Sequence, residues 1–165
     1  MSPSKIAALS LFIATAQSAQ ADWGYDTSND PMTGKATNSA YILSTNSLDL
    51  PFPHRGKNHG QITVRQHPKH GLDVIYSIDK GQIMCSRYSS CTINVRFDDA
   101  QPVTFNGNES ADRDSKVVFL SNPKRFIASA TKAKRILVQV NLFKNGAPVT
   151  EFHSTQPLKW PVGSK

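Results

Sequence analysis

The sequence predicts a mainly β (α+β) domain, an antiparallel β-sandwich or partial barrel with one helix packed across it and one hairpin disulfide. Three observations predict this fold. Short apolar runs, several of them alternating with polar residues, recur from about residue 61 and are separated by turn residues. Apolar residues at helical spacing follow Asn122 and Pro123. Cys85 and Cys91 flank a short polar turn between two strand-like runs.

The first 21 residues have the three parts of a secretory signal peptide. Lys5 provides a cationic start, residues 6–14 are apolar, and the segment closes with Ala19, Gln20 and Ala21. The apolar run is much shorter than the roughly 20 residues of a membrane-spanning helix. We therefore expect cleavage after Ala21 and a periplasmic or secreted product without a transmembrane segment. The remaining residues, 22–165, are enough for a single β-rich domain.

The start of the mature chain is polar and predicts an N-terminal arm. Residues 22–38 are rich in Asp, Asn, Ser, Thr and Gly, and Trp23 and Tyr25 are the large apolar groups there before Met32. We expect this arm to extend to about residue 40, with its aromatic rings tucked against the domain. A first strand is predicted within residues 41–50, followed by a basic, Pro- and Gly-containing loop at 51–60.

The middle of the chain predicts a series of short strands, since β-rich runs alternate there with Gly, Pro, Asp and Asn. The expected strands are 61–65, 72–78, 82–84, 92–97, 102–105 and 117–120. Turns are expected at 67–71 and 79–81, and a polar loop at 106–116. The strands at 82–84 and 92–97 are expected to form the disulfide-linked pair.

One helix is predicted after residue 121. Asn122 and Pro123 suit the N-cap and the first helical position. Phe126, Ile127 and Ala130 then lie at helical spacing, and we expect the helix to continue to about Lys134. The strand at 135–143 is the strongest in the chain. The pair Asn145-Gly146 predicts a hairpin that returns through residues 149–153.

The cysteine pair is predicted to form a structural disulfide. An oxidising compartment allows such bonds to persist, and closing this small loop contributes about 2–3 kcal/mol to stability. A redox pair and a metal site are the alternatives. Redox motifs place two residues between their cysteines and zinc sites need about four ligands, whereas five residues separate Cys85 from Cys91.

The formal net charge of +7 favours acidic partners, among which are anionic lipids, nucleic acids, polyanionic glycans and acidic proteins. Nucleic-acid binding would call for aromatic residues interleaved with the basic ones, and the basic runs have none. We therefore expect no nucleic acid as partner. The cations of the predicted helix have a solvated surface as their simplest interpretation, with a patch for an acidic partner as the alternative.

Titratable residues give no catalytic or metal-binding pattern. His54, His59, His67 and His70 cluster in the sequence, but they lie in polar turns beside cations that oppose a bound metal. Adjacent Asp98 and Asp99 end a strand and so point to opposite faces, which disfavours a paired acid and base. Arg96 shares a face with Asp98 and is expected to pair with it. Asp side chains that accept backbone N–H bonds in a turn are the simpler interpretation.

The order of several short landmarks resembles a group of uncharacterised secreted or periplasmic bacterial proteins. The landmarks are Trp23 and Tyr25, residues 30–34 (DPMTG), 62–65 (ITVR), the Cys85 and Cys91 pair, 95–99 (VRFDD), 133–138 (AKRILV), Phe143, Gly146, Glu151, Phe152 and 158–160 (LKW). The chain is also similar to the TagO-like accessory proteins associated with type VI secretion. The resemblance implies an envelope protein that acts through protein contacts, and it supplies no catalytic residues.

The favoured function is an exported, non-enzymatic binding or accessory module of the bacterial envelope, linked to a secretion system. We expect neither a metal nor a cofactor, and a protein partner. Its binding residues are predicted to be Arg87 and Tyr88 on the disulfide loop and Arg125 on the helix. One alternative is an inhibitor of an envelope-directed enzyme such as a lysozyme, with residues 86–90 as the inserted loop. The second alternative is a small periplasmic hydrolase that uses Asp98 or Asp99 with a nearby histidine.

Overall fold

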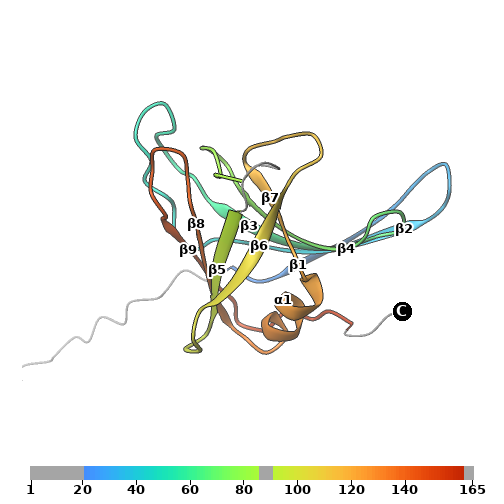
Figure 1. Ribbon diagram of the computed structural model, residues 1–165. Coiled ribbons are helices and arrows are strands. Elements are labelled where there is room, and N and C mark those ends of the chain that lie inside the picture. Colours follow the sequence, from blue (N-terminus) through green and yellow to red (C-terminus); the bar gives the residue numbers. More distant parts are fainter. Residues whose placement is uncertain (1–20, 86–90, 162–165) are drawn as a thin grey trace, which may run out of the picture.

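A computed structural model describes residues 21–85 and 91–161, and in them one antiparallel sheet of nine strands and a single helix (Figure 1). The spatial order of the strands is β1-β2-β3-β4-β7-β6-β5-β8-β9. Their bounds are β1 Gly24–Asn29, β2 Ala36–Leu43, β3 Gly60–His67, β4 Gly71–Ile78, β5 Cys91–Phe97, β6 Val103–Glu109, β7 Val117–Leu120, β8 Arg135–Val140 and β9 Val149–His153. The helix, α1, is Pro123–Ala130.

The sheet folds over on itself so that its two halves enclose one core (Figure 1). The hydroxyl of Thr150 in β9 lies 3.1 Å from the hydroxyl of Tyr76 in β4. Next to β2, the backbone N–H of Thr45 donates to the carbonyl of Glu151 in β9. The sheet nevertheless does not close into a barrel, since β1 and β9 remain its edge strands. The predicted mainly β, sandwich-like fold with a single helix is confirmed.

Strict alternation along the strands places one set of side chains in the core. In β5, residues at odd positions from Cys91 to Phe97 are buried, and those between them are partly or fully exposed. The same period of two appears in β3, β4 and β8, as expected for strands with one face on a core. The largest fully buried side chains are Tyr76, Phe126 and Phe152.

The helix packs its apolar face against the core side of the sheet. Phe126, Ile127 and Ala130 are buried. The Phe126 ring meets Phe97 of β5 and Phe105 of β6 edge-on, with centroids 5.3 and 6.0 Å apart. Such aromatic pairs add to the stabilisation from buried area. The predicted inward face of the helix is therefore confirmed.

The ends of the helix differ from the prediction. Pro123 is in the first turn, as expected, but Asn122 adopts a left-handed conformation with φ 60° and its side chain caps no N–H group. Asn tolerates this conformation better than most residues, which allows the reversal after β7. The helix ends at Ala130, before Lys134, and the backbone N–H groups of Lys134 and Arg135 donate to Asp98 instead.

Residues 24–40, predicted as an N-terminal arm, form β1, the turn at 30–35 and most of β2. These strands pair in register from Gly24 with Tyr41 to Asn29 with Ala36. Their outer parts are exposed on both faces, so the sequence carries no apolar alternation that could reveal them. The expected position is correct for Trp23, whose side chain is buried in the core, but not for Tyr25, which is 50% exposed.

The predicted pairing of residues 82–84 with 92–97 is also wrong. Strand β5 lies between β6 and β8. Residue Ile83 instead forms an isolated bridge with Leu142. Leu142, near the end of the predicted strand 135–143, forms this bridge, and β8 itself ends at Val140. The hairpin at Asn145 and Gly146 joins β8 to β9 as predicted.

The connections gather at two ends of the sheet. One end, called the loop end below, comprises residues 44–59, 79–85, 110–116 and 141–148. The other, called the helix end, comprises residues 30–35, 68–70, 98–102 and 121–134. Within the described part of the chain, no helix is long and apolar enough to cross a membrane.

Candidate functional site

The disulfide predicted between Cys85 and Cys91 is formed, and it lies at the loop end. Cys91 is buried at the start of β5, with its sulfur against Gly107 of β6. A methyl group added at Gly107 would collide with that sulfur and lie 2.7 Å from a methyl carbon of Val118. Glycine at this position therefore makes room for the bond. Since both sulfurs are bonded to each other, neither is a free thiol.

The predicted binding residues do not form one visible surface. Arg87 and Tyr88 lie outside the described residues. Arg125 is exposed on α1 at the helix end, where its guanidinium lies 5.5 Å from the centroid of the Phe105 ring. The structure thus places Arg125 at the opposite end of the strands from Cys85 and Cys91, which flank the other two.

Residues 79–85 connect all the described loops of the loop end. The backbone N–H of Ile83 donates to Ser115 in the β6–β7 loop at 2.7 Å. The N–H of Met84 donates to Asn141 at 2.8 Å, and that of Phe143 donates to Gln82 at 2.9 Å. Three connections distant in sequence are therefore held by backbone hydrogen bonds.

Asn58 fixes the remaining loop, residues 44–59, to the same segment. Its side chain is fully buried. The amide nitrogen of Asn58 donates to the Lys80 carbonyl at 3.1 Å, and the Lys80 N–H donates to the amide oxygen at 2.9 Å. The Lys80 ammonium also donates to the carbonyl of Arg55. Because buried polar groups are costly when unpaired, this reciprocal pair holds the loop in one position.

Large apolar side chains are exposed on these fixed loops. Phe52 is 80% exposed, Met84 49% and Phe143 45%. Met84 and Phe143 belong to the two segments joined by the hydrogen bonds described above. Exposed aromatic and methionine side chains on a rigid backbone are typical of protein-binding surfaces, where they bury apolar area at a small cost in entropy.

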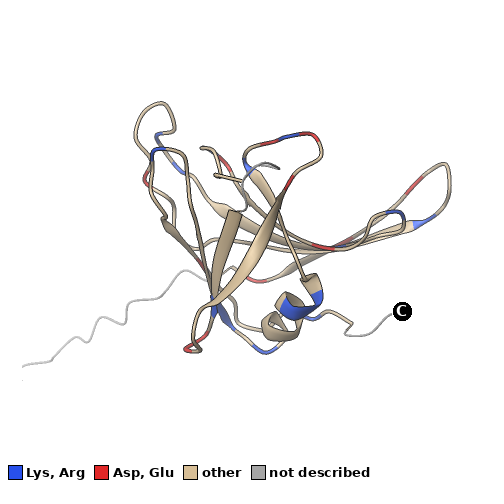
Figure 2. Cartoon of the chain, in the orientation of Figure 1, with Lys and Arg blue, Asp and Glu red and all other residues tan. Residues whose placement is uncertain are grey.

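The loop end also carries more basic than acidic residues. Its described loops contain Arg55, Lys57, Lys80, Arg113, Lys116 and Lys144, against Asp49, Asp79, Asp112 and Asp114. Figure 2 shows basic residues on these loops as well as on α1.

Three of these four carboxylates have backbone partners. Asp79 accepts the N–H of His59, Asp112 that of Asp114, and Asp114 that of Lys116. The hydroxyl of Ser110 and this backbone bond lower the pKa of Asp112. Within the described residues, Arg55, Lys57 and Arg113 form no salt bridge. The surplus positive charge at this end is therefore open to an acidic partner.

Asp98 and Asp99 have structural partners at the helix end. Asp98 accepts the backbone N–H groups of Lys134 and Arg135 at 3.1 and 2.9 Å. The predicted turn role of Asp98 is confirmed, but the predicted pair with Arg96 is wrong. Arg96 lies 3.9 Å from Asp99, which also binds Arg135 at 2.6 Å. Asp98 has a positive φ, which turns the chain at this point. The turn breaks the strand alternation that would have placed Asp98 on the same face as Arg96.

The histidines of the sequence cluster are separated. His59 contacts Ser44 at the loop end, whereas His67 and His70 stack at the β3–β4 turn, with centroids 4.6 Å apart. There, Nδ1 of His67 accepts the backbone N–H groups of Lys69 and His70. Desolvation lowers the pKa of His67, and His70 and Arg65 lower it further. In the described ranges, no three His, Cys, Asp or Glu residues are grouped as a metal site requires.

Sequence reasoning missed the exposed apolar residues of the loop end. Phe52 lies between two prolines, and this context could have indicated that its side chain is exposed, because proline disfavours a core strand there. Met84 and Phe143 gave no such signal, because each was part of a predicted strand.

Comparison with known proteins yielded no match to a family model, to a curated protein or to a solved structure.

Proposed function

We propose that this chain is an exported, non-enzymatic binding module of the bacterial envelope that acts through protein–protein contacts made by its loop end. The observation that carries the proposal is the combination of Phe52, Met84 and Phe143, all exposed, with unpaired cations on loops whose backbones are fixed by hydrogen bonds. The resemblance to TagO-like accessory proteins supports a place beside a secretion system.

The partner is a protein with an acidic rim around an apolar contact. Arg55 and Lys57 follow Phe52 in the β2–β3 loop, and Lys144 lies over the ring of Phe143 at 5.2 Å. Apolar side chains with cations beside them match an interface with an apolar centre and a charged rim. The rim charges contribute mainly to the rate and selectivity of association, so binding should weaken as salt is raised.

Affinity capture from envelope extract tests the proposal. The bait is the purified protein, and the loop-end variant is Lys57→Glu with Lys144→Glu. The control is Lys35→Glu, which changes an exposed cation in the β1–β2 turn of the helix end. We expect a partner that is retained by the wild type and the control and lost by the loop-end variant. A partner held equally by all three proteins would contradict the proposed surface.

The predicted binding residues Arg87, Tyr88 and Arg125 are tested in the same way. Charge reversal at Arg87 and replacement of Tyr88 by Ala should weaken capture if the disulfide loop extends the loop-end surface. Arg125→Glu, at the helix end, should leave capture unchanged. A loss with Arg125→Glu alone would move the binding surface to the helix.

The two alternative functions have distinct readouts. A lysis assay with lysozyme, with and without the purified protein, tests inhibition; protection that needs residues 86–90 would replace the accessory role by an inhibitory one. Asp98→Asn with Asp99→Asn tests the hydrolase. Both carboxylates have structural partners, so the variant is compared only after its fold is verified. Its hydrolase activity is then compared with that of the wild type.

A further inference from the structure

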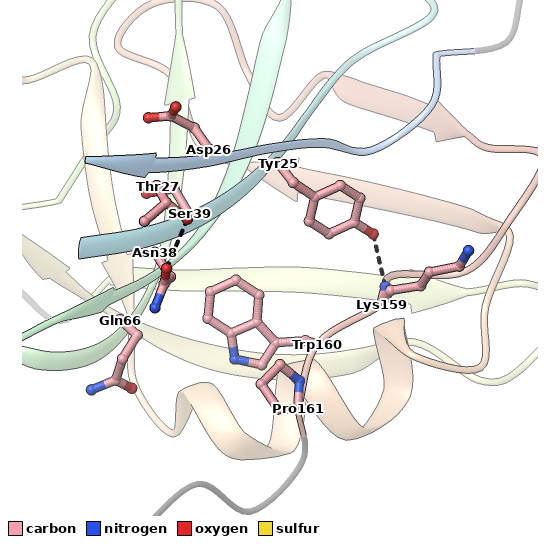
Figure 3. A pocket seen from close by; sticks show the side chains of 9 residues that line it. All are labelled: Tyr25, Asp26, Thr27, Asn38, Ser39, Gln66, Lys159, Trp160 and Pro161. Carbon is pink, nitrogen blue, oxygen red and sulfur yellow. Dashed lines mark hydrogen bonds between the residues drawn. The ribbon is translucent and has the colours of Figure 1, made fainter. Parts of the chain in front are cut away.

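A groove of about 230 Å³ lies toward the helix end, on the core side of β1, β2 and β3. Its lining comes from these strands and from the segment that follows β9 (Figure 3). The lining includes Tyr25, Thr27, Asn38, Gln66 and Trp160. The groove is remote from the loop end, so it is independent of the proposed function.

An indole ring forms one wall of the groove. Trp160 is partly buried against the core, and Figure 3 shows its ring directed toward Asn38 and Gln66. The segment is held at two points. The N–H of Lys159 donates to the hydroxyl of Tyr25 at 2.8 Å, and that of Leu158 donates to the carbonyl of Ala130 in α1. The indole is therefore positioned by the fold.

Neutral polar groups form the opposite wall. The hydroxyl of Thr27 donates to the amide oxygen of Asn38 at 2.9 Å, which leaves the amide nitrogen of Asn38 free to donate. Among the residues that the structure describes, none hydrogen-bonds to the side-chain amide of Gln66. Two carboxamides with unused donors and acceptors thus face an aromatic ring.

Formal charges point away from this centre. In Figure 3 the carboxylate of Asp26 and the ammonium of Lys159 are directed away from the indole. An ionic ligand would gain little in such a site, since an ion must recover its hydration energy through pairing. A ligand with both apolar C–H surfaces and neutral hydroxyl groups fits the indole and the two amides together.

We propose that this groove binds one ring of an uncharged saccharide, with a C–H face of the sugar on Trp160 and its hydroxyl groups bonded to Asn38 and Gln66. The volume supports a single ring, because pockets for larger ligands usually begin at about 300 Å³. The groove is open at the surface, so further sugar units of a glycan chain extend into solvent. Such a site would attach the module to a glycan chain.

Titration with neutral trisaccharides tests the assignment. The probes are chitotriose, cellotriose and maltotriose, and the readout is the backbone amide and indole N–H resonances in a ¹⁵N–¹H spectrum. We expect one of them to bind with a Kd on the order of 1 mM and to shift the Trp160 resonance but not that of buried Trp23. Trp160→Ala should weaken binding about tenfold or more, and Gln66→Ala about threefold to tenfold.

Matched controls separate this site from the loop end and from loss of the fold. Phe143→Ala removes an exposed aromatic ring at the loop end and should bind saccharide as the wild type does. Gln66→Ala changes a partly exposed side chain, so it remains informative if Trp160→Ala fails to fold. The proposal is overturned if none of the saccharides gives saturable shifts at about 10 mM. It is equally overturned if an extended peptide alone binds the groove, or if Gln66→Ala and a folded Trp160→Ala both bind as the wild type does.

Discussion

The two ends of the sheet expose different chemistry, although hydrogen bonds hold connections at both. At the loop end, four connections hold Phe52, Met84 and Phe143 in solvent beside unpaired cations. At the helix end, Phe126 packs on the sheet and Asp98 accepts the backbone N–H groups of Lys134 and Arg135, and the adjacent groove is lined by neutral amides and an indole. The first suits a protein partner with an acidic rim, the second a neutral polar ligand.

In this protein, the residues that fix the loops differ from those that provide the binding chemistry. Buried groups such as Asn58 and Cys91 fix the loops, whereas the exposed side chains that contact a partner add little to the fold. Changes to the first group should reduce stability, and changes to the second should reduce binding alone.

Phe126→Ala should destabilise the protein by about 4 kcal/mol. Its fully buried ring contacts both Phe97 and Phe105, so its removal leaves a cavity between the helix and the sheet. Urea unfolding followed by circular dichroism measures the change. Lys124→Ala, exposed on the same helix, is the control and should alter stability by less than about 0.5 kcal/mol. A loss below about 1 kcal/mol for Phe126→Ala would mean that the helix does not close the core.

Gly107→Ala should cost about 2–3 kcal/mol, because the added methyl group would collide with the sulfur of Cys91 and crowd Val118. The neighbouring exposed change Asn108→Ala is its control. Thermal unfolding of both variants checks the difference. Equal stability of the two would contradict the close packing of the disulfide on β6.

Asn58→Ala should cost about 2 kcal/mol, since it leaves the backbone groups of Lys80 without their buried partner. It should also weaken partner capture, because residues 44–59 lose their attachment to residues 79–85. Hydrogen exchange of the Lys80 amide gives a direct readout. Asn106→Ala, an exposed position in β6, serves as the matched change. Unchanged exchange at Lys80 would disprove the role of Asn58 in fixing the loop.

Tyr76→Phe should cost about 1 kcal/mol near neutral pH, because it removes a buried hydrogen bond to Thr150. Burial raises the pKa of Tyr76 from 10.0 to about 12. Its protonated form is thus favoured by folding, and that contribution is complete below about pH 10 and lost as pH rises to about 12. Two pKa units correspond to on the order of 2–3 kcal/mol.

The phenylalanine variant lacks this titration, so it should become more stable than the wild type near pH 12. Denaturant midpoints of both proteins between pH 9 and 12 provide the measurement. If their stability difference stayed constant over that range, the proposed burial of the tyrosine hydroxyl would be incorrect.

The sequence predicted the strands that alternate and failed where alternation is missing. Strands β3, β4, β7 and β9 lie close to their expected positions, because each buries one face. Strand β1, with the sequence GYDTSN, is exposed along most of its length, so its pairing with β2 left no apolar pattern. The order in which the strands pair could not be predicted from the sequence either, because β4 pairs with β7, which is distant in sequence.

The candidate sites were predicted only in part for a related reason. The disulfide was predictable because its cysteines are close in sequence and flank a turn. The groove was not, because Tyr25 and Trp160 come from opposite ends of the chain and meet only through the fold. The separation of Arg125 from the cysteine pair likewise depends on which end of the strands each connection occupies.

Site-specific photocross-linking in cells tests the binding role of the loop end most directly. A photoreactive phenylalanine analogue replaces either Phe52 at the loop end or Met32 at the helix end, which are 80% and 92% exposed. Our account predicts a discrete protein adduct from position 52 and none from position 32. Adducts from position 32 alone, or none from position 52, would contradict it.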